Sequence, residues 1–278
     1  LGTAYRYLCG LIQSERGNME RMEEVVDAAE YEALQQFVST SPWSAAAVLD
    51  RVASEADALL GGSGETTLIL DESGFAKQGR CSVGVARQWN GRLGKVDNSQ
   101  VAVFGALACG ARVVPIDVKL YLPAEWCNDP ARCDKAGIPE AERAYRTKPQ
   151  LALEIVRHQR RSGVRFDYVS ADGLYGNSSA FCRALDDDGE VFLMHVHADQ
   201  HVYVEDPRPV VPPQRSPRGR APSTLQAQCQ PQRVDTLAKE LAADDWERVV
   251  TRPTSTGPLR VDIQIGRASC RERVCHRV

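Results

Sequence analysis

The first 62 residues carry apolar side chains at every third or fourth position, as at Leu8 and Leu11. This period predicts amphipathic helices. We expect about three of them. One begins at Ser41–Trp43, with a serine cap and a proline at the first helical position, and ends at Gly61–Gly62. The pattern therefore predicts a helical N-terminal region over residues 1–62.

From Thr66 onward the pattern changes to short β runs that later alternate with helical periods. We expect strands over Thr66–Leu70, Ser82–Gln88, Gln100–Cys109 and Arg112–Tyr121, then a helix over Glu140–Ser162, a strand over Phe166–Ala171, a helix over Asn177–Asp186 and a strand over Val191–Val196. Adjacent strands followed by helix, strand, helix and strand predict a mixed α/β layout, antiparallel at first and parallel later.

Beyond Asp199 the pattern becomes irregular. Six prolines between Pro207 and Pro222, with interspersed arginines, predict a linker over residues 207–233. After it we expect a short helix over Val234–Asp245 and two strands over Trp246–Val250 and Leu259–Ile263.

Two aspartates close predicted buried strands, and each leads into a glycine-marked turn. Asp71 follows Thr66–Leu70, and Asp172 follows Phe166–Ala171. An unpaired buried charge is strongly disfavoured, and two carboxylates at one sheet edge repel each other unless a cation lies between them. The pair therefore predicts a divalent-metal site. The alternative is that each aspartate only caps the turn after its strand.

Composition narrows the function classes. Apolar residues make up 43% and charged residues 26% of the 278-residue chain, which is ordinary for a globular protein. No apolar run approaches the roughly 20 residues that a membrane span needs. Nine scattered cysteines favour reduced thiols and a cytoplasmic protein. The net charge of −3 is unusual for a DNA-binding protein, although arginines and lysines cluster over residues 80–95 and 208–220.

Two further groups have the residue types of a zinc site. For Cys127 and Cys133 we favour a structural role, because no second ligand pair accompanies them. For His195, His197 and His201 we favour packing or surface roles, because no carboxylate is fixed near them.

Several long motifs resemble the core of DDE-type insertion-sequence transposases. They are Asp71–Gly79, Ser82–Gln88, Gly94–Val101 and Ala171–Gly176, together with Glu15–Met22 and Ser41–Trp43 in the N-terminal region. The resemblance runs from about Tyr5 to about Ile263. It implies an RNase H-like α/β fold, in which the first and fourth strands lie side by side and Asp71 and Asp172 would meet.

The resemblance also implies metal-dependent cleavage and strand transfer of DNA, as part of an insertion sequence. Asp71 and Asp172 would be catalytic residues and ligands of Mg²⁺ or Mn²⁺, which prefer hard oxygen donors. Candidates for contacts to DNA are Lys77, Arg87, Gln88, Lys95 and Asn98. For Arg87 and Lys95 a solvated hairpin face is the alternative. For Asp97 we favour turn capping over a role as a further acidic neighbour. A protein of this kind is expected to work on transposon ends and target DNA as a homodimer, in association with the bacterial nucleoid.

The chain departs from the family pattern near its end. In the family, the third acidic residue is a glutamate on a helix that follows an inserted segment. We expect residues 63–206 to form the first part of the catalytic core and residues 234–264 to begin the inserted segment. Glu240 lies upstream of that point and is a weak substitute. The run Ile265–Val274 resembles translated adapter sequence, so residues 265–278 are expected to be non-native. We therefore expect a truncated, catalytically incomplete transposase. The alternatives are a nuclease of the same fold that does not join strands, and a catalytically dead, domesticated DNA-binding protein.

Overall fold

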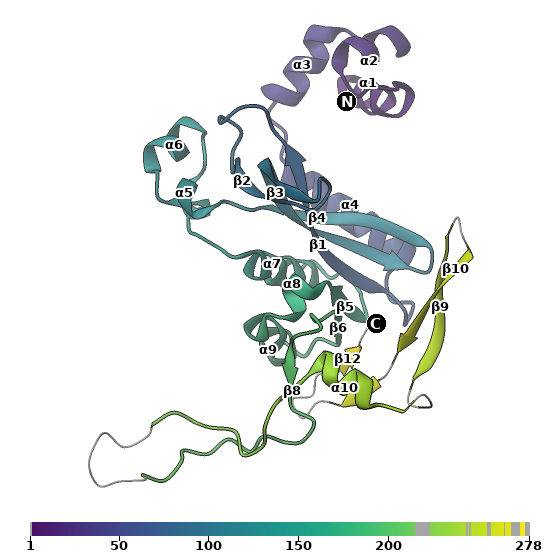
Figure 1. The fold of residues 1–278 in the computed structure, drawn as a ribbon. Coiled ribbons are helices and arrows are strands. Elements are labelled where there is room, and N and C mark those ends of the chain that lie inside the picture. Colours follow the sequence, from purple (N-terminus) through teal and green to yellow (C-terminus); the bar gives the residue numbers. More distant parts are fainter. Residues whose placement is uncertain are drawn as a thin grey trace. The chain divides into compact units, whose positions relative to one another are not determined.

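The computed structural model describes residues 2–214, 223–242, 244, 246–254, 257–263, 265–267 and 273–275 (Figure 1). The chain divides into two compact units, Leu1–Val48 and Leu49–Val278. The division falls inside helix α4 (Ala45–Leu60), because the second half of this helix contributes Ala53, Ala56 and Leu60 to the core of the second unit. The boundary at residue 62 that the sequence predicts is the point where α4 ends, next to Gly61 and Gly62.

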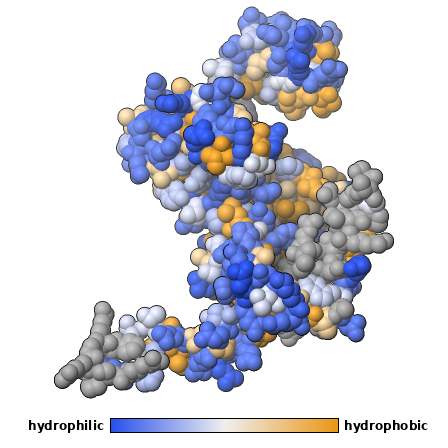
Figure 2. Space-filling view, in the orientation of Figure 1, coloured by the Kyte–Doolittle hydropathy of each residue, from blue (hydrophilic) through white to orange (hydrophobic). Residues whose placement is uncertain are grey.

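The N-terminal unit is a small helical cluster. It contains α1 (Gly2–Gln13), α2 (Met19–Val25), α3 (Tyr31–Ser39) and the start of α4. Met22 and Leu34 are fully buried in its core. Apolar residues also reach its surface, which Figure 2 shows as hydrophobic areas among hydrophilic ones.

Helix α4 starts later than the sequence predicts. Ser41 does not cap it: the helix begins at Ala45, and the Ser44 hydroxyl accepts a hydrogen bond from the Ala47 amide at 3.3 Å. Pro42 and Trp43 precede the helix, and the Trp43 ring stacks on Phe37 of α3.

The second unit is built on a six-stranded mixed sheet with the order β2-β3-β1-β5-β6, and β4 pairs with β3. The strands are β1 (Thr67–Ala76), β2 (Ala86–Asn90), β3 (Lys95–Cys109), β4 (Arg112–Leu120), β5 (Tyr168–Ala171) and β6 (Phe192–Met194). Pairs among β1 to β4 are antiparallel, whereas β1–β5 and β5–β6 are parallel. This mixed α/β sheet with flanking helices is consistent with the predicted RNase H-like fold.

Strand β1 is longer than the sequence predicts. It continues past Asp71 to Ala76, because all ten of its residues find register partners on the long strand β3, with Asp71 opposite Phe104. Gly74 is not a turn residue. A Cβ at this position would lie 2.8 Å from Asn90 Cγ, so the glycine lets the buried Asn90 side chain approach the strand.

Two other predicted boundaries also shift. The expected strand Ser82–Gln88 forms only from Ala86, because Gly84 adopts a φ of +73° in the turn before it. The expected helix Glu140–Ser162 is a short 3-10 turn, η1 (Glu140–Glu142), followed by α7 (Lys148–Arg161). Thr147 and Gln150 form a capping box at the start of α7.

Helix α7 packs on one face of the sheet and sets which residues face the core. Leu68 and Leu70 of β1 are buried in the same cluster as Leu151 and Ile155 of α7. Because side chains alternate along a strand, Asp71 belongs to the opposite face. The remaining helices of this region are α5 (Ala124–Cys127), α6 (Pro130–Lys135), α8 (Gly173–Gly176) and α9 (Ser179–Asp187), and Ser178 caps α9.

The later segments are short. They comprise β7 (His201–Val202), β8 (Gln232–Arg233), α10 (Val234–Glu240), the hairpin of β9 (Glu247–Thr254) and β10 (Gly257–Ile263), and the pair β11 (Ile265–Arg267) and β12 (Arg273–Cys275). The two predicted late strands are therefore confirmed as a hairpin, and the predicted helix ends at Glu240. Much of the expected linker (215–222) and of the expected non-native tail (268–272 and 276–278) lies outside the described residues. Among the helices that are described, none combines the length and apolar character of a bilayer-spanning segment.

Candidate functional site

The parallel pairing of β1 with β5 brings the two predicted aspartates to one place. The register partners at the end of this pairing are Leu70 and Ala171, and the next residues are Asp71 and Asp172. Neighbouring strands lie about 4.8 Å apart. Two residues about a hundred positions apart in sequence therefore become neighbours just past the end of the β1–β5 pairing, although β1 itself continues to Ala76. The strand parallel to β1 is the fifth in chain order, whereas the resemblance implies the fourth.

Each aspartate is held by one of its two carboxylate oxygens. Asp71 Oδ1 accepts a hydrogen bond from the amide of Glu72 at 2.7 Å, and Asp172 Oδ1 accepts one from the amide of Leu174 at 2.9 Å, where it caps α8. Within the described part of the chain, the Oδ2 atoms have no hydrogen-bond donor. Both side chains are exposed. One oxygen of each carboxylate is thus used for orientation and the other is available to a ligand.

The two negative charges affect the protonation of Asp71. Partial burial raises the pKa of Asp71, and the negative charges of Asp172 and Glu72 raise it further, while the Glu72 amide and the Lys148 ammonium act in the opposite direction. The raised pKa of Asp71 therefore comes first from burial and then from the like charges beside it.

A third carboxylate, Glu72, lies beside the pair but is already engaged. Its Oε1 accepts from Lys148 Nζ at 2.9 Å and its Oε2 accepts from the Tyr175 hydroxyl at 2.9 Å. The Glu72 and Lys148 side chains are only 20% and 19% exposed. Burial, and then the charge of Glu72, raise the pKa of Tyr175 strongly, so Tyr175 stays a hydrogen-bond donor. Glu72, Lys148 and Tyr175 were not predicted as site residues, although Glu72 and Tyr175 lie inside the two motifs that contain the aspartates.

The donor set fits a hard divalent cation, but only in part. Two neighbouring carboxylate oxygens are ligands that Mg²⁺ accepts, with water in the remaining positions. Among the described residues, no group of three or more His, Cys, Asp or Glu side chains is placed to hold a metal ion. Glu240, at the end of α10, therefore does not complete the pair, and the three histidines do not form a cluster.

Asp97 pairs with Lys95 at 3.0 Å, which lowers the pKa of Asp97, and the Asp97 carboxylate accepts a hydrogen bond from the Asn98 amide.

The candidate DNA contacts divide into two kinds. The amide groups of Gln88 and Asn98, on the hairpin of β2 and β3, bind backbone carbonyls. Gln88 Nε2 donates to Ser99 O of β3 at 2.7 Å, and Asn98 Nδ2 donates to Lys77 O at 2.6 Å and to Gly79 O at 2.9 Å in the loop after β1. Arg87 is exposed, and no described residue pairs with its guanidinium.

The other cations and the aromatic residues on or near the hairpin of β2 and β3 are also partly accessible. Lys77 is half-buried and Lys95 is exposed beside Asp97. Trp89 is 56% exposed, and the Arg92 guanidinium lies 6.0 Å from the centre of the exposed Phe75 ring. Arg92 belongs to the basic stretch of residues 80–95 that the sequence indicates, whereas Phe75 and Trp89 were not predicted as accessible side chains.

The cysteine pair contributes to packing. Buried Cys133 donates to the carbonyl of Trp126 at 3.2 Å, and Cys127 donates to that of Leu122 at 3.6 Å. Both lie around Trp126, whose indole N–H donates to Val85 O at 2.9 Å. The two thiols therefore help to fix α5 and α6 against the loop that precedes β2.

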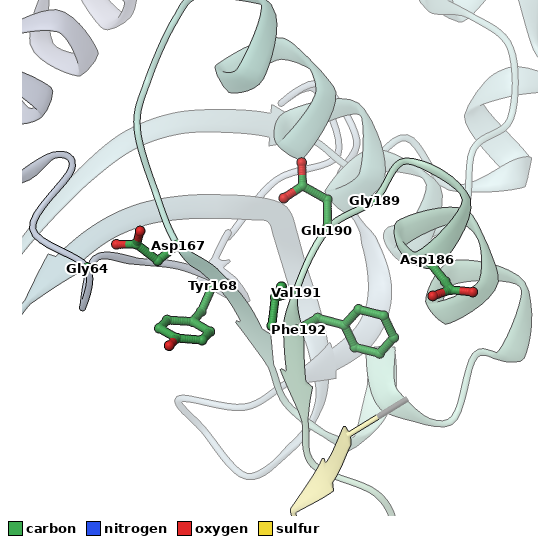
Figure 3. Close-up of a pocket in the computed structure, with 8 residues that line it drawn as sticks. All are labelled: Gly64, Asp167, Tyr168, Asp186, Gly189, Glu190, Val191 and Phe192. Carbon is green, nitrogen blue, oxygen red and sulfur yellow. The ribbon is translucent and has the colours of Figure 1, made fainter. Parts of the chain in front are cut away.

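A shallow pocket lies at the opposite end of β5 and β6 from the aspartates (Figure 3). Asp167 and Asp186 lie on opposite sides of it. Asp167 accepts from the amide of Thr66 at 2.9 Å, and Glu190 pairs with Arg160 at 2.7 Å. These contacts hold the starts of the strands together. The pocket lies at the start of β5, whereas Asp172 follows the end of this strand.

Comparison with known proteins gives a family and a relative. The family model described as DDE superfamily endonuclease matches residues 3–258. A protein of Microchaete diplosiphon, described as a probable transposase for insertion sequence element IS701, is 30% identical over 206 residues. That alignment covers 72% of this chain and 50% of the relative, so the chain spans about half the length of the curated relative.

Proposed function

Because the chain belongs to the DDE superfamily of endonucleases, we propose that it forms the part of an insertion-sequence transposase that holds catalytic metal between Asp71 and Asp172. Proteins of this superfamily generally use divalent metal ions. The observation that carries the proposal is the parallel register of Leu70 with Ala171, which juxtaposes the two aspartates.

In this proposal each aspartate has a defined role. The Oδ2 atoms of Asp71 and Asp172 would hold Mg²⁺, or Mn²⁺ in its place, while their Oδ1 atoms keep the carboxylates oriented through backbone amides. The chemistry that a bound ion supplies is activation of water or a 3′-hydroxyl and stabilisation of the leaving oxygen. The exposure of both side chains leaves the pair accessible to a DNA backbone.

The DNA itself would lie across the hairpin of β2 and β3. Lys77, Arg87 and Lys95 would contact phosphates, which position DNA without specifying its sequence. Gln88 and Asn98 would shape the hairpin through the backbone contacts described above. The substrates would be the ends of the element and its target, bound by a homodimer.

We further propose that the chain alone cleaves DNA poorly. The support is that the described residues bring no third acidic ligand to the pair. The same observation favours a second candidate function, a protein that binds DNA without cutting it. Metal dependence separates the two, because a DNA-binding protein would not need Asp71 or Asp172.

The test is a comparison of the wild-type protein with Asp71→Asn and Asp172→Asn, measuring Mn²⁺ binding, binding of element-end DNA and strand cleavage. We expect each substitution to abolish Mn²⁺ binding and to leave metal-free DNA binding unchanged. Full Mn²⁺ affinity in both variants would overturn the metal site. Rapid cleavage by the wild-type chain would overturn only the proposal of poor activity.

A further inference from the structure

Glu72 connects the two chain segments that carry the aspartates. It directly follows Asp71 on β1, and its Oε2 accepts a 2.9 Å hydrogen bond from Tyr175, three residues after Asp172. These partners are 103 positions apart in sequence. The contact is therefore a tertiary link between the strand of one aspartate and the turn of the other.

Tyr175 is firmly joined to Asp172. Its ring is fully buried and lies 5.9 Å from the ring of Phe181, measured between centroids. The carbonyl of Asp172 accepts from the amides of Tyr175 at 3.2 Å and Gly176 at 2.9 Å, and its side chain accepts from Leu174. A displacement of Tyr175 would therefore move Asp172.

Lys148 completes the arrangement and balances its charge. Its ammonium donates to Glu72 Oε1 at 2.9 Å. Lys148 is the first residue of α7, and the capping box of Thr147 and Gln150 fixes that helix end. With both oxygens of Glu72 occupied and its charge paired, Glu72 is not a third metal donor in this arrangement.

We propose that Glu72, Tyr175 and Lys148, together called the Glu72 bridge, are positioning residues that set the separation and orientation of Asp71 and Asp172 for a divalent cation. The proposal rests on the proposed function. Replacement of residues that orient metal ligands, without binding the metal themselves, typically changes the metal affinity about 10- to 100-fold.

The test uses the purified protein without DNA. Mn²⁺ affinity is measured by electron paramagnetic resonance of the unbound ion, for wild type, Tyr175→Phe and Glu72→Gln. Tyr168→Phe is the matched control, because Tyr168 is an exposed tyrosine at the other end of β5. Thermal unfolding establishes that each variant is folded at the temperature of the titration. Amide hydrogen exchange over residues 172–177 is the second measurement.

We expect Tyr175→Phe and Glu72→Gln to weaken Mn²⁺ binding about 10-fold or more and to speed exchange over 172–177, with Tyr168→Phe unchanged in both. If wild type binds Mn²⁺ and both bridge variants bind it equally well, the bridge is overturned and the proposed function stands. If wild type binds no Mn²⁺, the proposed metal site fails instead. The bridge is then decided by hydrogen exchange, and unchanged exchange in Tyr175→Phe would overturn it.

Discussion

Leu70 and Ala171 are register partners in the parallel pairing of β1 with β5, and an aspartate follows each of them. This relationship converts a sequence separation of about a hundred residues into one local site. The carboxyl ends of adjacent parallel strands lie at the same edge of that pairing, which is a frequent location for functional side chains in α/β folds.

Divalent cations should stabilise the wild-type protein and not Asp71→Asn. A ligand that binds only the folded state stabilises it by about 2.7 kcal/mol at one hundred times its dissociation constant. Thermal unfolding with and without Mg²⁺ measures this difference. A variant that removes an exposed carboxylate far from the pair, Glu65→Gln, just before the start of β1, should keep the full stabilisation. Equal stabilisation of Asp71→Asn would contradict the site.

Without metal, the sign of the Asp71→Asn effect should reverse. The pKa of Asp71 is raised in the folded protein, so the folded state holds the proton more tightly. The stability that this gives is present below the usual aspartate pKa and is lost as the pH rises through the raised value. At pH 7 the metal-free variant should therefore be slightly more stable, by a few tenths of a kcal/mol for so exposed a group. Urea unfolding at pH 4 and pH 7 tests this, and a less stable variant at pH 7 would contradict it.

The hairpin residues should separate into DNA contacts and structural residues. Arg87→Ala should weaken DNA binding and lower the slope of log affinity against log salt by about 1, because one phosphate contact is lost. Asn98→Ala should instead destabilise the fold by about 1–3 kcal/mol, since two backbone carbonyls lose their donor. Salt-dependent DNA titrations and urea unfolding of both variants are the measurements. An Arg87→Ala protein with the wild-type salt slope would exclude this arginine from the contact.

Tyr175 should make the protein sensitive to alkali. Its pKa is raised well above 10 in the folded protein, so above pH 10 it ionises in the unfolded state only. Stability should therefore fall above pH 10, by up to about 1.4 kcal/mol per pH unit for this one group. Tyr175→Phe should show a shallower decline between pH 10 and 11. Tyr121, whose pKa is raised to about 12, contributes to the same decline, but it is present in both proteins and does not affect the comparison. The same slope in Tyr175→Phe and wild type would contradict the assignment.

The sequence predicted the strands of the sheet from local patterns, whereas the meeting of the aspartates was implied by the resemblance to DDE-type transposases. Buried strands are short apolar runs, and the motifs around Asp71 and Asp172 are contiguous in the chain. The predicted end of β1 was wrong because a tertiary contact determines how far the strand extends. Gly74 has the appearance of a turn residue, but its role is to admit the side chain of Asn90 from another strand.

The Glu72 bridge could not be predicted from the same patterns. Its contacts join residues 76 and 103 positions apart, and neither Lys148 nor Tyr175 belongs to a periodic motif that specifies a partner. The hairpin shows the same limit for residue type. An asparagine or glutamine can bind DNA or its own backbone equally well, and only the turn geometry shows that Asn98 does the second.

Asp117 should be one of the most costly charged residues to remove. It is 4% exposed on β4, and its Oδ2 accepts from His158 Nδ1 at 2.7 Å and from Gln159 Nε2 at 2.8 Å, which ties the strand to α7. Asp117→Ala leaves these two side chains without their acceptor, so we expect a loss of about 3 kcal/mol or more. Asp50→Ala is the matched control, because Asp50 contacts the other nitrogen of His158 at 3.4 Å but is 52% exposed, and it should cost less than about 1 kcal/mol. Urea unfolding of the two variants compares them directly. Equal losses would show that burial of Asp117 does not decide its contribution.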